Sequence, residues 1–351
     1  QREWAEHLDV EVETTNSIGL KMRLIPPGEF LMGSSQEEIE DLTMEAQRLE
    51  LASRYGDRIP LESPRHQVTL TQPFVMSVNE VSRGQFRKFV EATGYLCTSQ
   101  LDGKGGMGFV DGKQTIAPQF AWDTQLGNGQ TLTDFHPVTN VSWTDAMAFC
   151  KWLSTQENAT YTLPSEAQWE FACRAGTESR FSYGTDLGKH ELYATSKGNR
   201  LQLTGAKQPN PFGMHDMHGN VWEICRDWRG PYTATPVIDP IGQTKQCVKR
   251  GGGANFIPSD ARSAQRNLHY RDLCQWNDGF RIVRVLPRQG QPRQAAAEQS
   301  TVDLLTGIDL ERDIWFRPIR NPECEVKYSG GEFTALSEAG DLTTKLHLQF
   351  P

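Results

Sequence analysis

Apolar and polar positions along this chain alternate in short runs, which predict short strands and separate helices. Residues 18–34 predict two strands around the turn Pro26-Pro27-Gly28, and residues 66–77 predict a further strand. Residues 35–56 are rich in charge, with Ile39 and Leu42 among apolar residues spaced for one helical face. We therefore predict an amphipathic helix over 35–56, capped by its first residue, a serine.

Three more helices are predicted from the residues that begin them. Ser82 begins a helix that Gly94 ends. Ser142 and Ser165 begin two others, and each is followed three residues later by Asp145 or Gln168, which completes a capping box. Between these helices, residues 98–135 are rich in Gly, Gln and Asp and predict a long ordered loop.

The second half of the chain predicts loops held by a few short strands. Within 175–285, the segments 248–253 and 279–285 are expected to pair as core strands. Residues 287–300 are poor in apolar side chains and predict a linker. Strand-like runs follow at 302–308, 324–330 and 345–350. The expected organisation is a large domain at 1–286, the linker at 287–300 and the start of a second β-rich module at 301–351.

Composition narrows the class of protein. The 31 glycines and 19 prolines among 351 residues indicate many turns. A formal charge of −8, from 36 basic and 44 acidic residues, argues against nucleic-acid binding, which needs clustered cations. No apolar run approaches the ~20 residues that span a bilayer. The seven cysteines show no CxxC or zinc spacing, so we expect most to be free and buried.

Nine motifs resemble, in order, those of the formylglycine-generating-enzyme (sulfatase-modifying factor) family. They cover about residues 15–286 and lie at Ile25–Ser34, Glu62–Val68, Asn79–Phe86, His136–Trp143, Leu163–Phe171, Asn210–Glu223, Arg250–Gly253, Ala261–Ser263 and Gly279–Arg281. The resemblance implies an α+β fold related to C-type lectins, with little regular secondary structure and with stabilising calcium.

The resemblance also shows what is missing. Catalytic members of the family carry two cysteines between a Gly-Gly-Ser and an Ala-Arg-Ser motif, where the thiolates bind copper and capture a substrate cysteine. Here residues 253–260 contain no cysteine, and Cys274 alone cannot form a two-thiolate site. Copper(I) prefers thiolate ligands, and thiol exchange needs a nucleophilic sulfur. We therefore expect no bound copper and no catalytic residue.

Two candidate sites remain. The resemblance implies a calcium ion held by Asn220, Val221 and Glu223, with oxygen ligands of the kind calcium prefers; the alternative is a purely structural turn. A ligand-binding face is predicted after Gly253, because aromatic and Arg side chains on a fixed scaffold suit recognition. Its candidates are Asn255, Phe256, Arg262, Arg266, His269, Tyr270 and Trp276. The alternative is that half of them fill the core, Phe256 and Trp276 in particular.

Three functions are compatible with these observations. The favoured one is a non-catalytic binding or scaffolding domain for a protein, peptide or glycan, inside a larger multidomain protein that is exported or linked to the cell surface. The second is an oxidoreductase of the same family, for formylglycine generation or sulfur oxygenation, with an altered active site. The third is a structural accessory subunit of an envelope complex.

Overall fold

The computed structural model divides the chain into two compact units, Gln1–Leu286 and Pro287–Pro351. It describes residues 1–286 except 52–55, 57, 102, 197 and 243–245, together with the backbone of two strands in the second unit. Those strands, β17 (Cys324–Ser329) and β18 (Glu332–Ser337), pair antiparallel, which confirms the strand predicted at 324–330. The predicted linker 287–300 and the runs 302–308 and 345–350 lie outside the described residues.

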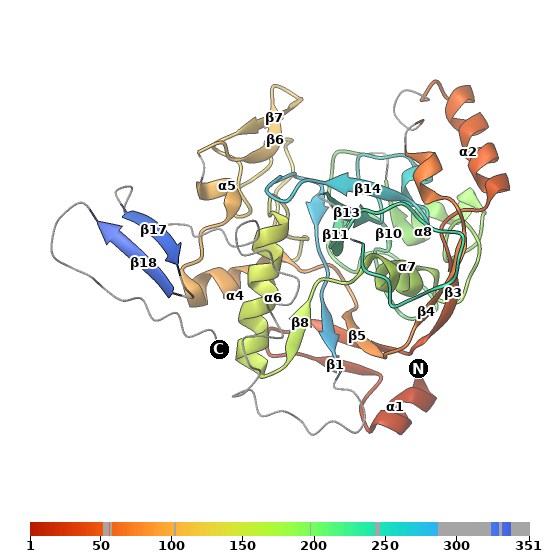
Figure 1. Cartoon of the computed structure of the whole chain (residues 1–351). Coiled ribbons are helices and arrows are strands. Elements are labelled where there is room, and N and C mark those ends of the chain that lie inside the picture. Colours follow the sequence, from red (N-terminus) through yellow and green to blue (C-terminus); the bar gives the residue numbers. More distant parts are fainter. Residues whose placement is uncertain are drawn as a thin grey trace. The chain divides into compact units, whose positions relative to one another are not determined.

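The helices of the first unit begin where serine side chains cap them. Ser35, Ser82, Ser142 and Ser165 each form a capping box, so all four predicted helix starts are confirmed. The helices are α1 (Arg2–Leu8), α2 (Gln36–Arg48), α4 (Arg83–Thr93), α5 (Thr98–Leu101), α6 (Trp143–Glu157), α7 (Glu166–Arg174) and α8 (His190–Tyr193), with 3-10 turns at Ile59–Glu62, Leu187–Lys189 and Pro258–Ala261 (Figure 1). No helix in the described part of the chain is long and apolar enough to cross a membrane.

A five-stranded antiparallel sheet forms one side of the main core. Its order is β1 (Glu13–Thr15), β2 (Lys21–Ile25), β5 (Phe74–Ser77), β16 (Val283–Val285) and β8 (Thr160–Thr162). The aromatic rings of Phe86 from α4, Phe149 from α6 and Phe280 just before β16 pack together at centroid distances of 5.5–6.2 Å. All three side chains are fully buried, so this cluster joins the two long helices to the sheet.

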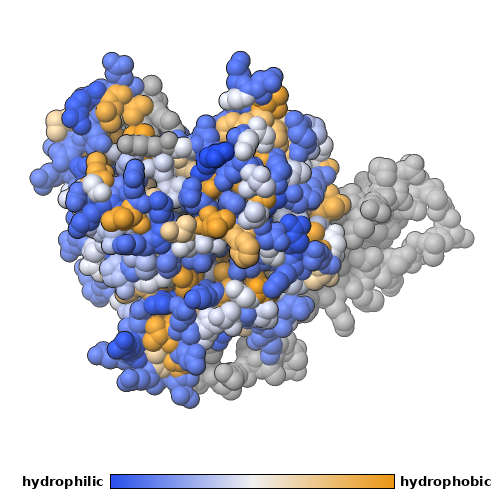
Figure 2. Space-filling model, turned by 180° about the vertical axis from the view of Figure 1, so that it is seen from behind, coloured by the Kyte–Doolittle hydropathy of each residue, from blue (hydrophilic) through white to orange (hydrophobic). Residues whose placement is uncertain are grey.

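The candidate site lies on a second, four-stranded sheet. It consists of β14 (Arg266–His269), β13 (Cys247–Arg250), β11 (Trp222–Trp228) and β15 (Asp278–Gly279). Three smaller sheets complete the unit: β12 (Val237–Ile238), β4 (His66–Leu70) and β3 (Gly28–Met32); β9 (Ala194–Thr195) with β10 (His218–Gly219); and β6 (Gly106–Val110) with β7 (Lys113–Ala117). The face of the molecule drawn in Figure 2 is mainly polar, with separate small apolar areas.

Three predictions of local structure were wrong. Residues 66–77 form two strands in different sheets, β4 and β5, interrupted ahead of Pro73, which has no N–H to donate. The loop predicted at 98–135 contains helix α5 and the hairpin β6–β7. The segments 248–253 and 279–285 do not pair with each other, because β13 pairs with β11 and β14, whereas β16 pairs with β5 and β8.

Candidate functional site

Loop 253–263, which joins β13 to β14, packs directly on the four-stranded sheet. The ring of Phe256 meets the buried indole of Trp222 edge-on, with centroids 5.3 Å apart. Asn277 Nδ2 donates to Asn255 Oδ1 at 2.9 Å. A Cβ atom at Gly253 would lie 3.1 Å from Trp222 Cδ1, so the glycine allows the backbone to approach the indole closely. The start of the loop is therefore closed against the domain.

Two predicted ligand-binding arginines are buried in ion pairs. Arg262 donates from Nη1 and Nη2 to the two carboxylate oxygens of Glu62, at 2.6 and 2.7 Å. Arg266 pairs with Glu166 and lies over the ring of Tyr232, with its guanidinium carbon 4.0 Å from the centroid. Both arginines are less than 4% exposed. The prediction that they face a ligand is corrected, because both bind other parts of the same domain.

His269 and Trp276 are also corrected. His269 Nδ1 lies 3.0 Å from Asp278 Oδ2, and burial lowers the pKa of this imidazole. The indole of Trp276 is completely buried and meets the ring of Phe109 edge-on at 5.2 Å. Both side chains belong to the interior. For Trp276 this agrees with the alternative stated above, that the side chain fills the core.

Three of the seven predicted ligand residues keep contact with solvent. Tyr270, at the end of β14, is 59% exposed, and Asn255 and Phe256 are half-buried at the start of the loop. The role of these three in binding stays a prediction.

The cysteine side chains of the described residues are buried. Cys150, Cys173, Cys225 and Cys247 are free and buried, as predicted for most of the cysteines, and the side chains of Cys97 and Cys274 are buried as well. Burial raises the pKa of the Cys173 and Cys247 thiols to about 12, and it also raises the pKa of Cys150 and Cys225. These groups are therefore protonated thiols near neutral pH, and the thiolate is the form that binds metal and attacks disulfides.

The predicted calcium ligands do not fit a calcium ion as a set. Both carboxylate oxygens of Glu223 accept hydrogen bonds from the buried Arg281, and Trp169 Nε1 donates to one of them at 2.6 Å. Asn220 Oδ1 accepts from the backbone N–H of Gln202 at 2.9 Å. Of the three predicted ligands, only Val221 remains a candidate, through its backbone carbonyl oxygen.

A neighbouring group of buried oxygens, which sequence reasoning missed, fits a cation better. Glu80 Oε2 accepts from Asn220 Nδ2 at 3.2 Å, whereas Oε1 has no donor in the described part of the chain. Asp216 accepts from the N–H of Gly205 through Oδ2, and its Oδ1 likewise has no donor there. Asn79 Oδ1, also without a donor, lies beside Gly205. Unpaired buried oxygens are costly unless a proton or a cation satisfies them.

The charges of this group also favour a bound cation. Burial, and then the nearby carboxylates of Asp216 and Glu223, raise the pKa of Glu80 well above its ordinary value. Burial also raises the pKa of Asp216. Three carboxylates therefore share one cation, Arg281. Since no set of three His, Cys, Asp or Glu side chains within the described residues is arranged as a metal site, an ion here would need amide or backbone oxygens as well.

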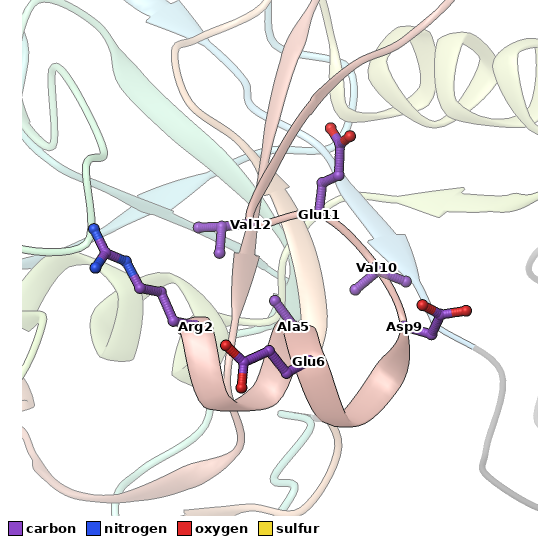
Figure 3. Close-up of a pocket in the computed structure, with 7 residues that line it drawn as sticks. All are labelled: Arg2, Ala5, Glu6, Asp9, Val10, Glu11 and Val12. Carbon is purple, nitrogen blue, oxygen red and sulfur yellow. The ribbon is translucent and has the colours of Figure 1, made fainter.

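A hollow of about 510 Å³ lies elsewhere, along the N-terminal helix (Figure 3). It is lined by Arg2, Ala5, Glu6, Asp9, Val10, Glu11 and Val12, all from one short stretch of the chain. In Figure 1, helix α1 lies at the bottom of the view and strand β14 lies in the upper half. None of the candidate ligand or metal residues lines this hollow.

Comparison with known proteins matches residues 10–286 to the family described as Sulfatase-modifying factor enzyme 1-like domain. The Formylglycine-generating enzyme of Bos taurus is 30% identical over 305 residues, covering 75% of this chain and 74% of that protein. The enzyme of the same name from Streptomyces coelicolor is 28% identical, covering 74% and 87%. The solved structure of PvdO from Pseudomonas aeruginosa superposes with a TM-score of 0.59 and 26% identity, covering 78% and 98%. The predicted α+β fold of this family is therefore confirmed.

Proposed function

Since the chain belongs to the Sulfatase-modifying factor enzyme 1-like family over residues 10–286, we propose that it is a non-catalytic binding or scaffolding member of that family. The observation that carries the proposal is the absence of any cysteine from residues 253–263. The second unit, Pro287–Pro351, supports a place in a multidomain protein.

The buried thiols support this proposal by their protonation state. A thiol with a pKa of about 12, as for Cys173, is ionised in only about one molecule in 10⁵ at pH 7, by the tenfold-per-unit relation. Cys274, next to the candidate face, is 5% exposed. Copper capture and disulfide exchange both need thiolates, so Cys150, Cys173, Cys225 and Cys247 do not favour the altered-oxidase alternative.

The calcium expectation is retained with different ligands. Glu80 and Asp216 would hold Ca²⁺ through their unpartnered oxygens, with Asn79 and the backbone around Val221 as neutral oxygen donors. A divalent cation would balance the charge, because three carboxylates and one arginine leave a net charge of −2. Bound there, calcium supplies no chemistry beyond linking the segment at 79–80 to the segment at 216–223. This is a structural role.

The recognition surface that remains is formed by Asn255, Phe256 and Tyr270. An exposed phenol and a half-buried ring offer apolar area with few torsions to order, and the amide offers hydrogen bonds. This combination suits a protein, peptide or glycan surface.

The catalytic alternative is tested with the full-length chain, oxygen, copper(I) and a Cys-x-Pro-x-Arg peptide. We expect the peptide mass to stay unchanged while the Streptomyces coelicolor enzyme, run in parallel, converts it. Copper(I) titration against a competing chelator should show no tight site. Conversion of the cysteine to the aldehyde by this chain would refute the non-catalytic proposal.

The binding role is tested on glycan and peptide arrays. The Phe256→Ala/Tyr270→Ala double variant should lose at least about tenfold of the signal on any probe that the wild type binds, which is about 1.4 kcal/mol. Leu31→Ala, a change at a 38% exposed apolar residue of β3, serves as the control and should keep the signal. Unchanged binding by the double variant would place the recognition surface elsewhere.

A further inference from the structure

The hairpin β6–β7 has a backbone pattern with two distinct edges. Val110 pairs with Lys113 across the two-residue turn Asp111-Gly112, whose residues both have positive φ. In such a hairpin the residues that flank the turn exchange hydrogen bonds, and every second pair does so after it. The residues between, Met107 and Phe109 on β6 and Gln114 and Ile116 on β7, direct their N–H and C=O groups outward.

The edge along β6 is already bound to the domain. The N–H of Phe109 donates to the carbonyl of Leu126 at 2.7 Å, and the N–H of Met107 donates to the carbonyl of Cys274 at 3.2 Å. The ring of Phe109 packs on Trp276. These contacts fix the hairpin on the domain, from which it projects in Figure 1.

The edge along β7 has no such partner in the described residues. No backbone or side-chain hydrogen bond within them reaches the outward backbone groups of Gln114 or Ile116. The side chains of Lys113, Gln114 and Ile116 are exposed, the last of them by 51%. A free, straight edge of this kind is a template for another strand, and a two-stranded ribbon gains stability from added strands.

We propose that β7 pairs with β7 of a second copy of this chain, antiparallel, about a two-fold axis at Thr115. In this register Gln114 faces Ile116 of the second copy, and Ile116 faces its Gln114. Each of these pairs exchanges two hydrogen bonds, so the outward groups of one edge satisfy those of the other. The result is a four-stranded sheet, β6-β7-β7-β6, across the two molecules.

The side chains of β7 are compatible with this self-pairing. Lys113 lies opposite Ala117 of the second copy, so the two lysines do not face each other. Thr115 lies opposite its own symmetry mate in the close, non-hydrogen-bonded pair, with Cα atoms about 4.5 Å apart, and Thr–Thr pairs stabilise sheets. The strand thus matches itself in hydrogen bonding and in charge.

The contact is expected to be weak. A five-residue strand edge forms four interchain hydrogen bonds and buries less than the ~1,600 Å² of a typical stable interface. Each chain also carries a formal charge of −8, whose repulsion is screened within about 8 Å at physiological ionic strength. The dimer should therefore form at high protein concentration and strengthen with added salt.

Sedimentation velocity of the full chain tests the proposal. The average mass should rise from that of one chain toward that of two between about 10 µM and about 1 mM, the range of weak complexes. Thr115→Lys and Thr115→Glu each place like charges opposite each other at the axis and should raise the dissociation constant at least about tenfold. An equimolar mixture of the two variants should dimerise at least as well as the wild type.

Control measurements distinguish a loss of strand pairing in these variants from a loss of folding. Circular dichroism should show both variants folded, and Ile238→Lys, which adds the same charge at a 69% exposed strand residue, should dimerise like the wild type. A wild type that stays monomeric at the highest concentration would overturn the proposal and leave this edge for a strand of another protein. Charge variants that dimerise normally, or a mixture that does not recover, would overturn it as well.

Discussion

Replacing Glu80 by glutamine is the sharpest test of the buried carboxylate group. The substitution keeps the shape and the hydrogen bond from Asn220 but removes one of the two uncompensated negative charges. At a calcium concentration about 100 times the dissociation constant, the ion adds about 2.7 kcal/mol to the stability of the wild type. For a domain of this size that gain raises the melting temperature by about 5–10 °C.

Removing the Glu80 charge should weaken calcium binding at least about tenfold, or 1.4 kcal/mol, so the shift at the same calcium concentration should fall to about half or less. Without calcium, the substitution is expected to stabilise the protein at high pH instead of weakening it. The folded-state pKa of Glu80 is raised, so the native state holds a proton that the unfolded state loses above about pH 4.3. That stabilisation is present below this pH and is lost as the pH rises through the folded pKa.

Glu80→Gln does not titrate, so in EDTA at pH 8 it should be at least as stable as the wild type. At pH 4, below the unfolded-state pKa of a glutamate, the two should differ by less than about 0.5 kcal/mol. Differential scanning calorimetry in EDTA and in calcium, at both pH values, measures all four states. Glu62→Gln is the control: it breaks a buried pair with Arg262, should cost about 3–5 kcal/mol, and should leave the calcium shift intact. A wild type indifferent to calcium, with Glu80→Gln less stable at both pH values, would refute the cation site.

Other consequences of the structure can be measured directly. Trp276→Ala should lower the free energy of unfolding in urea by about 3–5 kcal/mol, whereas Tyr270→Ala should change it by less than about 0.5 kcal/mol; equal effects would contradict the assignment of one residue to the core and the other to the surface. The six described cysteines should not react with a thiol reagent at pH 8 until urea unfolds the chain, and fast modification of Cys274 in the native protein would reopen the oxidase hypothesis. Arg281→Met should cost about 3–5 kcal/mol by leaving Glu223 without its cation, as measured by urea denaturation, and Glu223→Gln in the same protein should recover part of the loss.

Sequence reasoning located the parts of the fold that local chemistry determines. A serine followed three residues later by an acid or amide marks a helix start whatever surrounds it, and α2, α4, α6 and α7 begin at such serines. The hairpin β6–β7 also had a local signal, the pair Asp111-Gly112 between two short runs of strand-forming residues, but the glycines that precede it, at 103, 105, 106 and 108, hid that pattern.

The parts that depend on distant partners were not predictable in the same way. An arginine in a loop after Gly253 reads as a surface side chain until the acid that binds it is known. Arg262 finds Glu62, which lies 200 residues earlier in the chain, and Arg266 finds Glu166. The same holds for Glu223, whose partner Arg281 turns a predicted calcium ligand into half of an ion pair.

These distant pairs explain what the motifs of the family do in this chain. The motif at Glu62–Val68 binds the motif at Ala261–Ser263 through the pair of Glu62 with Arg262. The motif at Asn210–Glu223 binds the motif at Gly279–Arg281 through Glu223 and Arg281.

Two further links join the same set. Glu170, in the motif at Leu163–Phe171, pairs with Arg250, which opens the motif at Arg250–Gly253. Glu80, in the motif at Asn79–Phe86, accepts from Asn220. Seven motifs are thus held together by four buried polar contacts, and breaking one buried ion pair typically costs about 3–5 kcal/mol. The folded state needs these residues whether or not the domain catalyses a reaction.

The reactive loop of the family is outside this set of contacts. Residues 254–258 contribute to none of the four links, and the thiols that catalysis needs in the family belong to this region. This chain therefore carries the motifs that identify the family together with a loop that contains no cysteine. The motifs support the fold assignment, and the content of the loop decides whether the family's oxidative reaction is available to the protein.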